Sequence, residues 1–190
     1  MPSAVDIVNQ ALVLIGDKLI SALSDTGDRA IAANAIYATV RDAVLTSHPW
    51  RFAIVRDSLT PDVASPEYGW SYAYTLPTSP KCLRVLDIDE DNPGDIPWAI
   101  EYGKLLCNES TIKIRYIAQV TDPNLWDFPF IQAMKGALAV ELASALTKKT
   151  AVLETAIKFF GLWMPLAQAV DGKQGTADTT YIPDLTRVRY

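Results

Sequence analysis

The sequence predicts an α+β protein: a four-helix bundle with a β-rich insertion between its second and third helices and an extended C-terminal arm. Three observations predict this architecture. Apolar residues recur every three or four positions near both ends of the chain, which is typical of helices. Between residues 51 and 120 the apolar residues alternate with polar ones, which is typical of strands. Residues 173–190 contain too few apolar side chains to form a core, and such a segment commonly becomes ordered on another surface.

Each helical region begins or ends at a recognisable signal. Ser3 and Asp6 form a capping-box-like start, and Gly16 is a suitable stop for the first helix. Asp122 followed by Pro123 is a strong helix-start signal after the strands. We predict helices over residues 3–16, 28–47, 130–146 and 151–170.

The middle of the chain predicts five or six short strands. In the last of them Ile112, Ile114 and Tyr116 share one face, and Lys113 and Arg115 share the other. The predicted strands cover residues 50–54, 72–76, 82–88, 98–102, 104–107 and 111–117. The change from helical to strand periodicity and back divides the chain into a helical bundle (1–50 and 121–172), an inserted β-domain (51–120) and a C-terminal arm (173–190).

Composition excludes several classes of protein. Hydrophobic residues are 49% of the chain and charged residues 21%, which argues against a disordered chain. No apolar run reaches the roughly 18 residues of a membrane span, and the N-terminus lacks a signal-peptide pattern, so we expect a cytosolic product. The net charge of −5 argues against a protein that grips DNA phosphates. Cys82 and Cys107 are expected to be buried free thiols.

Few residues suggest chemistry. No glycine-rich phosphate loop or nucleophile motif is present, and His48 is the only histidine. A cation beside a helix end is the favoured interpretation of His48, and catalysis is the alternative. The acidic run Asp87, Asp89, Glu90, Asp91 and Asp95 lacks calcium-loop spacing, so a solvated loop is favoured over a metal site or a glycosidase pair.

Two aromatic groups allow a functional and a structural interpretation. Tyr68, Trp70, Tyr72 and Tyr74 resemble a base-stacking platform, but residues 66–75 contain no Lys or Arg, so strand packing or a protein interface is favoured. On the fourth helix, Phe159, Phe160, Trp163 and Met164 are too apolar for a single helix face. Core packing is the default interpretation there, and a subunit interface is the alternative.

Several short motifs, taken in order, resemble tail tubular protein A-like adaptors of tailed phages. The opening motifs are Asp6 to Leu12, Ile15-Gly16, Ala32 to Asn34 and Pro49 to Ala53. Strand-region motifs follow at Tyr74 to Pro77, Cys82 to Leu86 and Ile112 to Ile117, leading to Val120 to Pro123. Phe130 and the alanine-rich helix Leu138 to Ala143 complete a resemblance over about residues 4–170. Each motif alone reflects only side-chain packing or turn formation. The resemblance rests on the order in which the motifs follow one another along the chain.

The resemblance implies a structural, non-enzymatic subunit of a virion, assembled in the host cytoplasm and needing no metal or cofactor. It implies a ring of identical copies, expected to number twelve, between the portal protein and the tail tube or nozzle protein. Genomic double-stranded DNA would pass through that ring without specific binding. The family fold is a helical bundle with an inserted β-domain, in agreement with the periods above.

The resemblance also gives the terminal arm and the acidic loop expected roles. The loop residues Asp89, Glu90, Asp91 and Asp95 are expected to line the channel or to face the tail, since acidity reduces phosphate binding. The arm is expected to anchor on the portal through Tyr181, Ile182, Leu185, Arg187, Val188, Arg189 and Tyr190. One alternative is a cell-wall hydrolase with a carboxylate pair such as Asp89 and Glu101; another is a soluble binding module.

Overall fold

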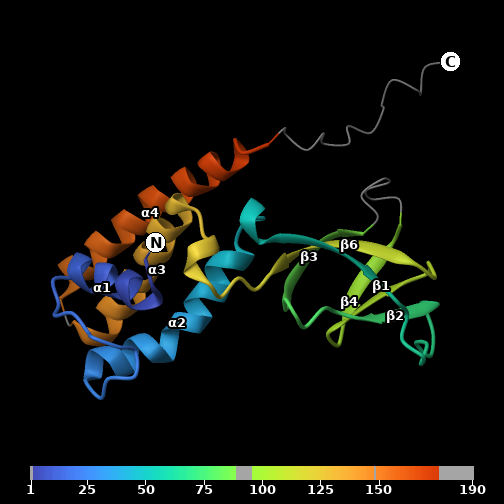
Figure 1. The fold of residues 1–190 in the computed structure, drawn as a ribbon, viewed down its shortest axis with the longest axis horizontal. Helices are drawn as coiled ribbons and strands as arrows, with labels where there is room; N and C mark the ends of the chain where they lie inside the picture. Colours follow the sequence, from blue (N-terminus) through green and yellow to red (C-terminus); the bar gives the residue numbers. More distant parts are fainter. Residues whose placement is uncertain (1, 89–95, 148, 176–190) are drawn as a thin grey trace.

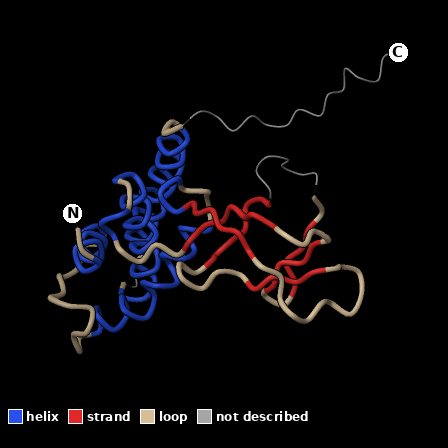
Figure 2. The backbone as a smooth tube through the Cα atoms, turned by 45° about the vertical axis from the view of Figure 1, so that its right-hand side comes forward, coloured by secondary structure: helices blue, strands red, loops and turns tan. Residues whose placement is uncertain are grey.

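The computed structural model describes residues 2–88, 96–147 and 149–175, and its helices and strands gather at opposite ends of an elongated molecule (Figures 1 and 2). The helices are α1 (Ala4–Leu14), α2 (Asp28–Thr46), α3 (Phe128–Leu146) and α4 (Thr150–Gly172). The strands are β1 (Ile54–Leu59), β2 (Tyr72–Thr75), β3 (Cys82–Ile88), β4 (Trp98–Glu101), β5 (Lys104–Cys107) and β6 (Ile112–Ala118). Two 3₁₀ turns, η1 (Arg51–Ala53) and η2 (Pro123–Leu125), follow α2 and β6.

The capping signals predicted for α1 are confirmed. The Ser3 hydroxyl accepts a hydrogen bond from the Asp6 N–H at 3.2 Å, and the Ser3 N–H donates to the Asp6 carboxylate at 2.8 Å. Gly16 adopts a φ of +72°, and the Asp17 N–H donates back to the Leu12 carbonyl at 2.9 Å. These bonds close the helix in a Schellman turn, a conformation that glycine adopts without strain.

The α+β class is confirmed, but the predicted four-helix bundle with an insertion is wrong. Helices α1, α2 and α4 each pack on α3, which serves as a hub, in place of four helices around a common axis. The lengths explain this: α1 has 11 residues and spans about 16 Å, whereas α3 has 19 residues and spans about 28 Å. A helix as short as α1 covers only part of α3, so no four-sided core forms.

Gly136 sets the approach of α3 and α4. A Cβ built on Gly136 would lie 3.0 Å from the Phe160 Cα and 3.2 Å from the Phe160 Cβ. Any larger residue at this position would force the α4 backbone to shift by a few tenths of an ångström.

The strands form two antiparallel three-stranded sheets. One has the order β1-β6-β3 and the other the order β2-β5-β4. The predicted alternation in β6 is confirmed, since Ile112, Ile114 and Tyr116 are buried and Lys113 is exposed. Side chains from both sheets meet in one cluster: Tyr74, Val85, Ile88, Leu105, Cys107, Ile112, Ile114, Tyr116 and Ala118.

The helical core extends into the strand region. It includes the buried side chains of Trp50, Ala53 and Ile117, and Leu83 and Leu86 of β3 pack against it. The Trp50 ring makes an edge-to-face contact with Phe130, with 5.0 Å between ring centroids. The helices and the first sheet therefore share apolar contacts at their junction.

Two predicted boundaries differ from the structure. The strand expected at residues 50–54 is the turn η1, and β1 begins only at Ile54. The helix expected from residue 130 begins at Phe128, with Pro129 in its first turn, where a missing N–H costs nothing. Asp122 does cap a helix start, but only that of η2, through the Asn124 N–H at 2.9 Å.

Candidate functional site

Helix α4 is apolar on nearly all sides but packs on only one. Between Ile157 and Val170 its only polar side chains are Lys158 and Gln168. Over its whole length, only Ala156, Ala167 and Asp171 are buried. A helix that is apolar all round normally lies in the interior of a larger structure. The part of the chain that the structure describes therefore leaves much of α4 uncovered.

The uncovered side of α4 holds a row of side chains spaced one turn apart. We call Lys158, Leu162, Leu166 and Val170 the α4 row. Leu162 is 66% exposed, Leu166 is 46% exposed and Val170 is 37% exposed. Ile157, on another side of the helix, is 50% exposed. Together these four apolar residues expose an area equivalent to about two complete side chains, a concentration typical of interaction surfaces.

The aromatic side chains of α4 that the sequence left open between core and interface are half-buried. Phe159, Phe160 and Trp163 lie outside the cluster of buried core residues and their packed neighbours, whereas Met164 packs against that cluster. Phe159 is covered on one ring face by the Lys135 ammonium, 4.8 Å from the ring centroid. Core packing therefore accounts for Met164, whereas Phe159 and Phe160 lie beside Gly136 of α3 and Trp163 is left half-buried.

An apolar groove opens between α2, α3 and α4. Its volume is about 240 Å³, and Glu141 is the only charged residue among the described residues that line it. The groove is lined by Val40, Ala43, Val44 and Ser47 of α2, by Ala137, Val140 and Glu141 of α3, and by Phe160 of α4.

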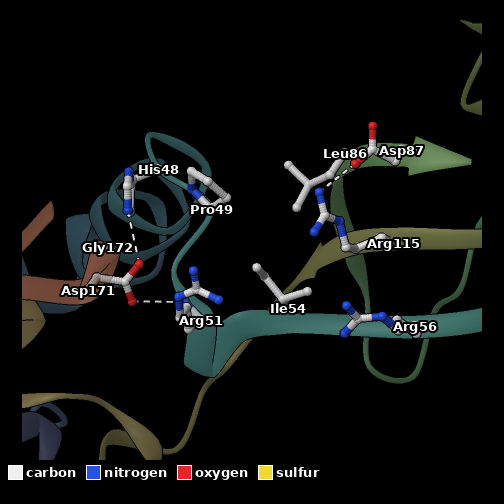
Figure 3. Close-up of a pocket in the computed structure, with 10 residues that line it drawn as sticks. All are labelled: His48, Pro49, Arg51, Ile54, Arg56, Leu86, Asp87, Arg115, Asp171 and Gly172. Carbon is white, nitrogen blue, oxygen red and sulfur yellow. Dashed lines mark hydrogen bonds and ion pairs between the residues drawn. The ribbon is translucent and has the colours of Figure 1, made fainter. Parts of the chain in front are cut away.

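A second, polar cleft lies at the junction of the helices and the first sheet (Figure 3). Its volume is about 530 Å³. Its described lining residues come from six parts of the chain. They are His48 and Pro49 after α2, Arg51 in η1, Ile54 and Arg56 in β1, Leu86 and Asp87 in β3, Arg115 in β6, and Asp171 and Gly172 in α4. Arg115 pairs with Asp87 at 2.6 Å.

Asp171 ties the C-terminal end of α4 to the segment between α2 and β1. Its carboxylate is buried, accepts a hydrogen bond from the Arg51 backbone N–H at 2.9 Å, and lies 3.1 Å from the His48 Nε2 (Figure 3). The His48 ring also makes an edge contact with Trp50, with 4.8 Å between centroids. These contacts fix the position from which the chain continues beyond Gly172.

The cleft can bind ions or hold elements together, but the described residues of its lining include no hydroxyl or thiol nucleophile. Among its described lining residues are an imidazole, two carboxylates and three guanidinium groups, with no Ser, Thr or Cys side chain. His48 and Asp171 have the geometry of a base and its orienting partner, which acyl-transfer chemistry would need to combine with a hydroxyl or thiol. The contacts of Asp171 connect the end of α4 to the segment after α2, and the Arg115–Asp87 pair connects β6 to β3.

Many residues singled out in the sequence lie outside the described part of the chain. These are Asp89, Glu90, Asp91 and Asp95 of the acidic loop and Tyr181, Ile182, Leu185, Arg187, Val188, Arg189 and Tyr190 of the arm. The roles expected for them stay predictions. The pair Asp89 and Glu101 is likewise untested, although Glu101 is exposed at the end of β4.

The histidine, tyrosine and cysteine residues discussed from the sequence lie within the described part of the chain. His48 lies just beyond α2, as predicted, and its partner is Asp171. Tyr74 is fully buried between the sheets, whereas Tyr68 is 87% exposed. Both cysteines are free: Cys107 is buried, and Cys82 is half-buried. Burial raises the pKa of the Cys82 thiol to about 11 and also raises the pKa of Cys107.

Sequence patterns did not single out Asp171 or the α4 row. An isolated aspartate at the end of an apolar helix was the available signal for Asp171. For the α4 row, the signal was the long stretch from Ile157 to Val170 with only two polar residues. Periodicity alone does not reveal which side of such a stretch stays uncovered.

Comparison with known proteins gives no match, either among protein-family models or among curated proteins. Within residues 2–88, 96–147 and 149–175, no three or more His, Cys, Asp or Glu side chains gather to hold a metal ion. In the same ranges, no helix has both the length and the apolar character that a membrane crossing requires.

Proposed function

We propose that this chain is a structural, non-enzymatic head-to-tail adaptor of a tailed phage. Copies of it would form a ring, expected to have twelve members, between the portal and the tail tube or nozzle. Genomic double-stranded DNA would pass through the ring during ejection without specific binding. The virion neck would be its site of action.

The uncovered apolar surface of α4 is the observation that carries the proposal. A subunit of a ring must keep apolar surface that only its neighbours cover, and α4 keeps the exposed area of about two complete side chains. At about 1.5–3 kcal/mol for each fully buried Leu, Ile or Val, covering all four of these side chains contributes roughly 3–6 kcal/mol per subunit.

Two further features support an adaptor. The net charge of −5 suits a conduit through which DNA must pass without being held. The Asp171 contacts fix the end of α4, so that residues 173–190 start from a defined place on the body. An arm anchored in this way suits the proposed docking of Tyr181 to Tyr190 on the portal.

Co-assembly with the portal protein of the same phage tests the proposal. The full chain is expected to join purified portal rings, with a mass increase equal to a whole ring of copies in native mass spectrometry. A chain ending at Gly172 is expected to fold, with an unchanged circular dichroism spectrum, but not to join the portal.

The hydrolase alternative predicts a different outcome. If the chain never joins the portal, and if it degrades cell wall in a reaction that the double variant D89N/E101Q loses, the adaptor proposal is wrong. Normal portal assembly by the chain that ends at Gly172 would contradict only the arm's anchoring role.

A further inference from the structure

Helix α4 presents two different edges. Phe160 lines the groove, and Leu162 lies two residues further on, about 200° around the helix axis. Leu166, one turn after Leu162, lies on the same side as Leu162. The α4 row and the groove therefore face different directions on one chain, as the two halves of a heterologous interface must.

The two surfaces match in polarity. Apart from Lys158 at its start, the α4 row is apolar, and apart from Glu141 and Ser47 the groove lining is apolar. The row offers large protruding side chains in Leu162 and Leu166. The groove offers a volume of about 240 Å³ beside the small side chains of Ala43 and Ala137.

The two surfaces also match in charge. Lys158 is the single cation of the α4 row, and Glu141 is the single charged residue of the groove lining. Both side chains are exposed, and neither makes an ion pair within the part of the chain that the structure describes. Opposite charges at the edge of two apolar surfaces fix their register and orientation.

We infer that the α4 row of one copy docks in the α2–α3–α4 groove of the next copy, with Lys158 of the first copy paired with Glu141 of the second. The contact is head-to-tail, so every copy uses both surfaces and a chain of copies closes into a ring when the rotation allows. This inference rests on the proposed function for its biological setting, and it names the surfaces by which the copies join.

Two blocking variants test the head-to-tail geometry. Leu162→Glu blocks the α4 row, and Ala43→Arg blocks the groove; both positions are exposed, so both chains are expected to fold. In sedimentation velocity near the solubility limit, the wild-type chain is expected to form oligomers larger than dimers. Each variant alone is expected to be monomeric, and a mixture of the two is expected to form dimers, because one intact interface remains per pair.

A charge exchange tests the pairing. Lys158→Glu and Glu141→Lys are each expected to weaken oligomer formation about tenfold, and the double variant is expected to restore it. Glu67→Lys, which changes an exposed charge between β1 and β2, is the matched control and is expected to leave assembly unchanged.

Three results would overturn the inference: a wild-type chain that stays monomeric up to its solubility limit, a mixture of blocking variants that stays monomeric, or a double charge variant as weak as the single ones. A wild-type dimer that the Ala43→Arg variant retains would indicate an α4-to-α4 contact and would also overturn it. In each case a chain that still joins the portal leaves the adaptor proposal standing. Oligomers that behave as inferred but never join the portal contradict the adaptor proposal alone.

Discussion

Two glycine-to-alanine substitutions on facing helices should have opposite effects on stability. In Gly136→Ala the new methyl group would lie 3.0 Å from the Phe160 Cα and 3.2 Å from the Phe159 Cδ1. Because the first of these atoms is backbone, the α4 backbone beside Phe160 has to shift by a few tenths of an ångström. In Gly161→Ala nothing lies within 4 Å of the added methyl group.

The expected magnitudes follow from two opposing effects. Alanine in a helix interior is about 1 kcal/mol more favourable than glycine. Overpacking a well-packed contact costs about 1–3 kcal/mol. Gly136→Ala is therefore expected to lower the free energy of unfolding by about 1 kcal/mol, and Gly161→Ala to raise it by about 1 kcal/mol. For a chain of this size each change shifts Tm by about 2–4 °C.

Urea denaturation of dilute, monomeric protein measures both effects. The midpoint should fall for Gly136→Ala and rise for Gly161→Ala, with the m-value unchanged in both. If Gly136→Ala were as stable as the wild type, or more stable, the close contact of α3 with α4 described above would be wrong.

Three other predictions concern separate parts of the chain. Leu162→Glu is expected to change the monomer's unfolding free energy by no more than about 0.5 kcal/mol. It is nevertheless expected to keep the chain monomeric in sedimentation velocity, because it removes about 1–2 kcal/mol of apolar burial per interface and places a carboxylate in an apolar groove. A large loss of monomer stability in urea would show that Leu162 belongs to the core. Hydrogen bonds from the Ser3 N–H and hydroxyl hold the pKa of Asp6 below its ordinary value. The Asp6 charge therefore stabilises the fold above the unfolded-state pKa, and that stability is lost as pH falls through the folded-state pKa. Asp6→Asn should thus be less stable than wild type at pH 7, and urea titrations in which this difference in stability does not shrink in acid would refute the cause given. Because burial raises the pKa of both Cys82 and Cys107, neither thiol should react rapidly with a disulfide reagent near neutral pH until the chain is denatured, and fast reaction of the folded chain would contradict that burial.

Local signals predicted local structure well in this chain. Ser3, Asp6 and Gly16 bound α1 as expected, because capping bonds involve only neighbouring residues. The alternation of Ile112, Ile114 and Tyr116 identified the buried face of β6, because side chains of a strand alternate between its two faces.

These local signals do not predict how the helices pack on one another or which distant residues make contact. The sequence contains four stretches of helical periodicity, but these do not specify that three of the helices pack on α3. The predicted four-helix bundle was therefore wrong. The Asp171 contact with Arg51 and His48 joins residues more than a hundred positions apart, which no local pattern encodes. Nor could the pattern around Phe159 and Phe160 show that a glycine on another helix, Gly136, sets their position.

The central claim is that the apolar surface of α4 becomes buried when copies of this chain assemble. A side-chain-resolution image of the chain bound to a portal ring measures this most directly. The account predicts a closed ring of copies in which Leu162 and Leu166 of each subunit are buried against α2 and α3 of its neighbour. An assembled ring in which those leucines still face solvent would contradict it.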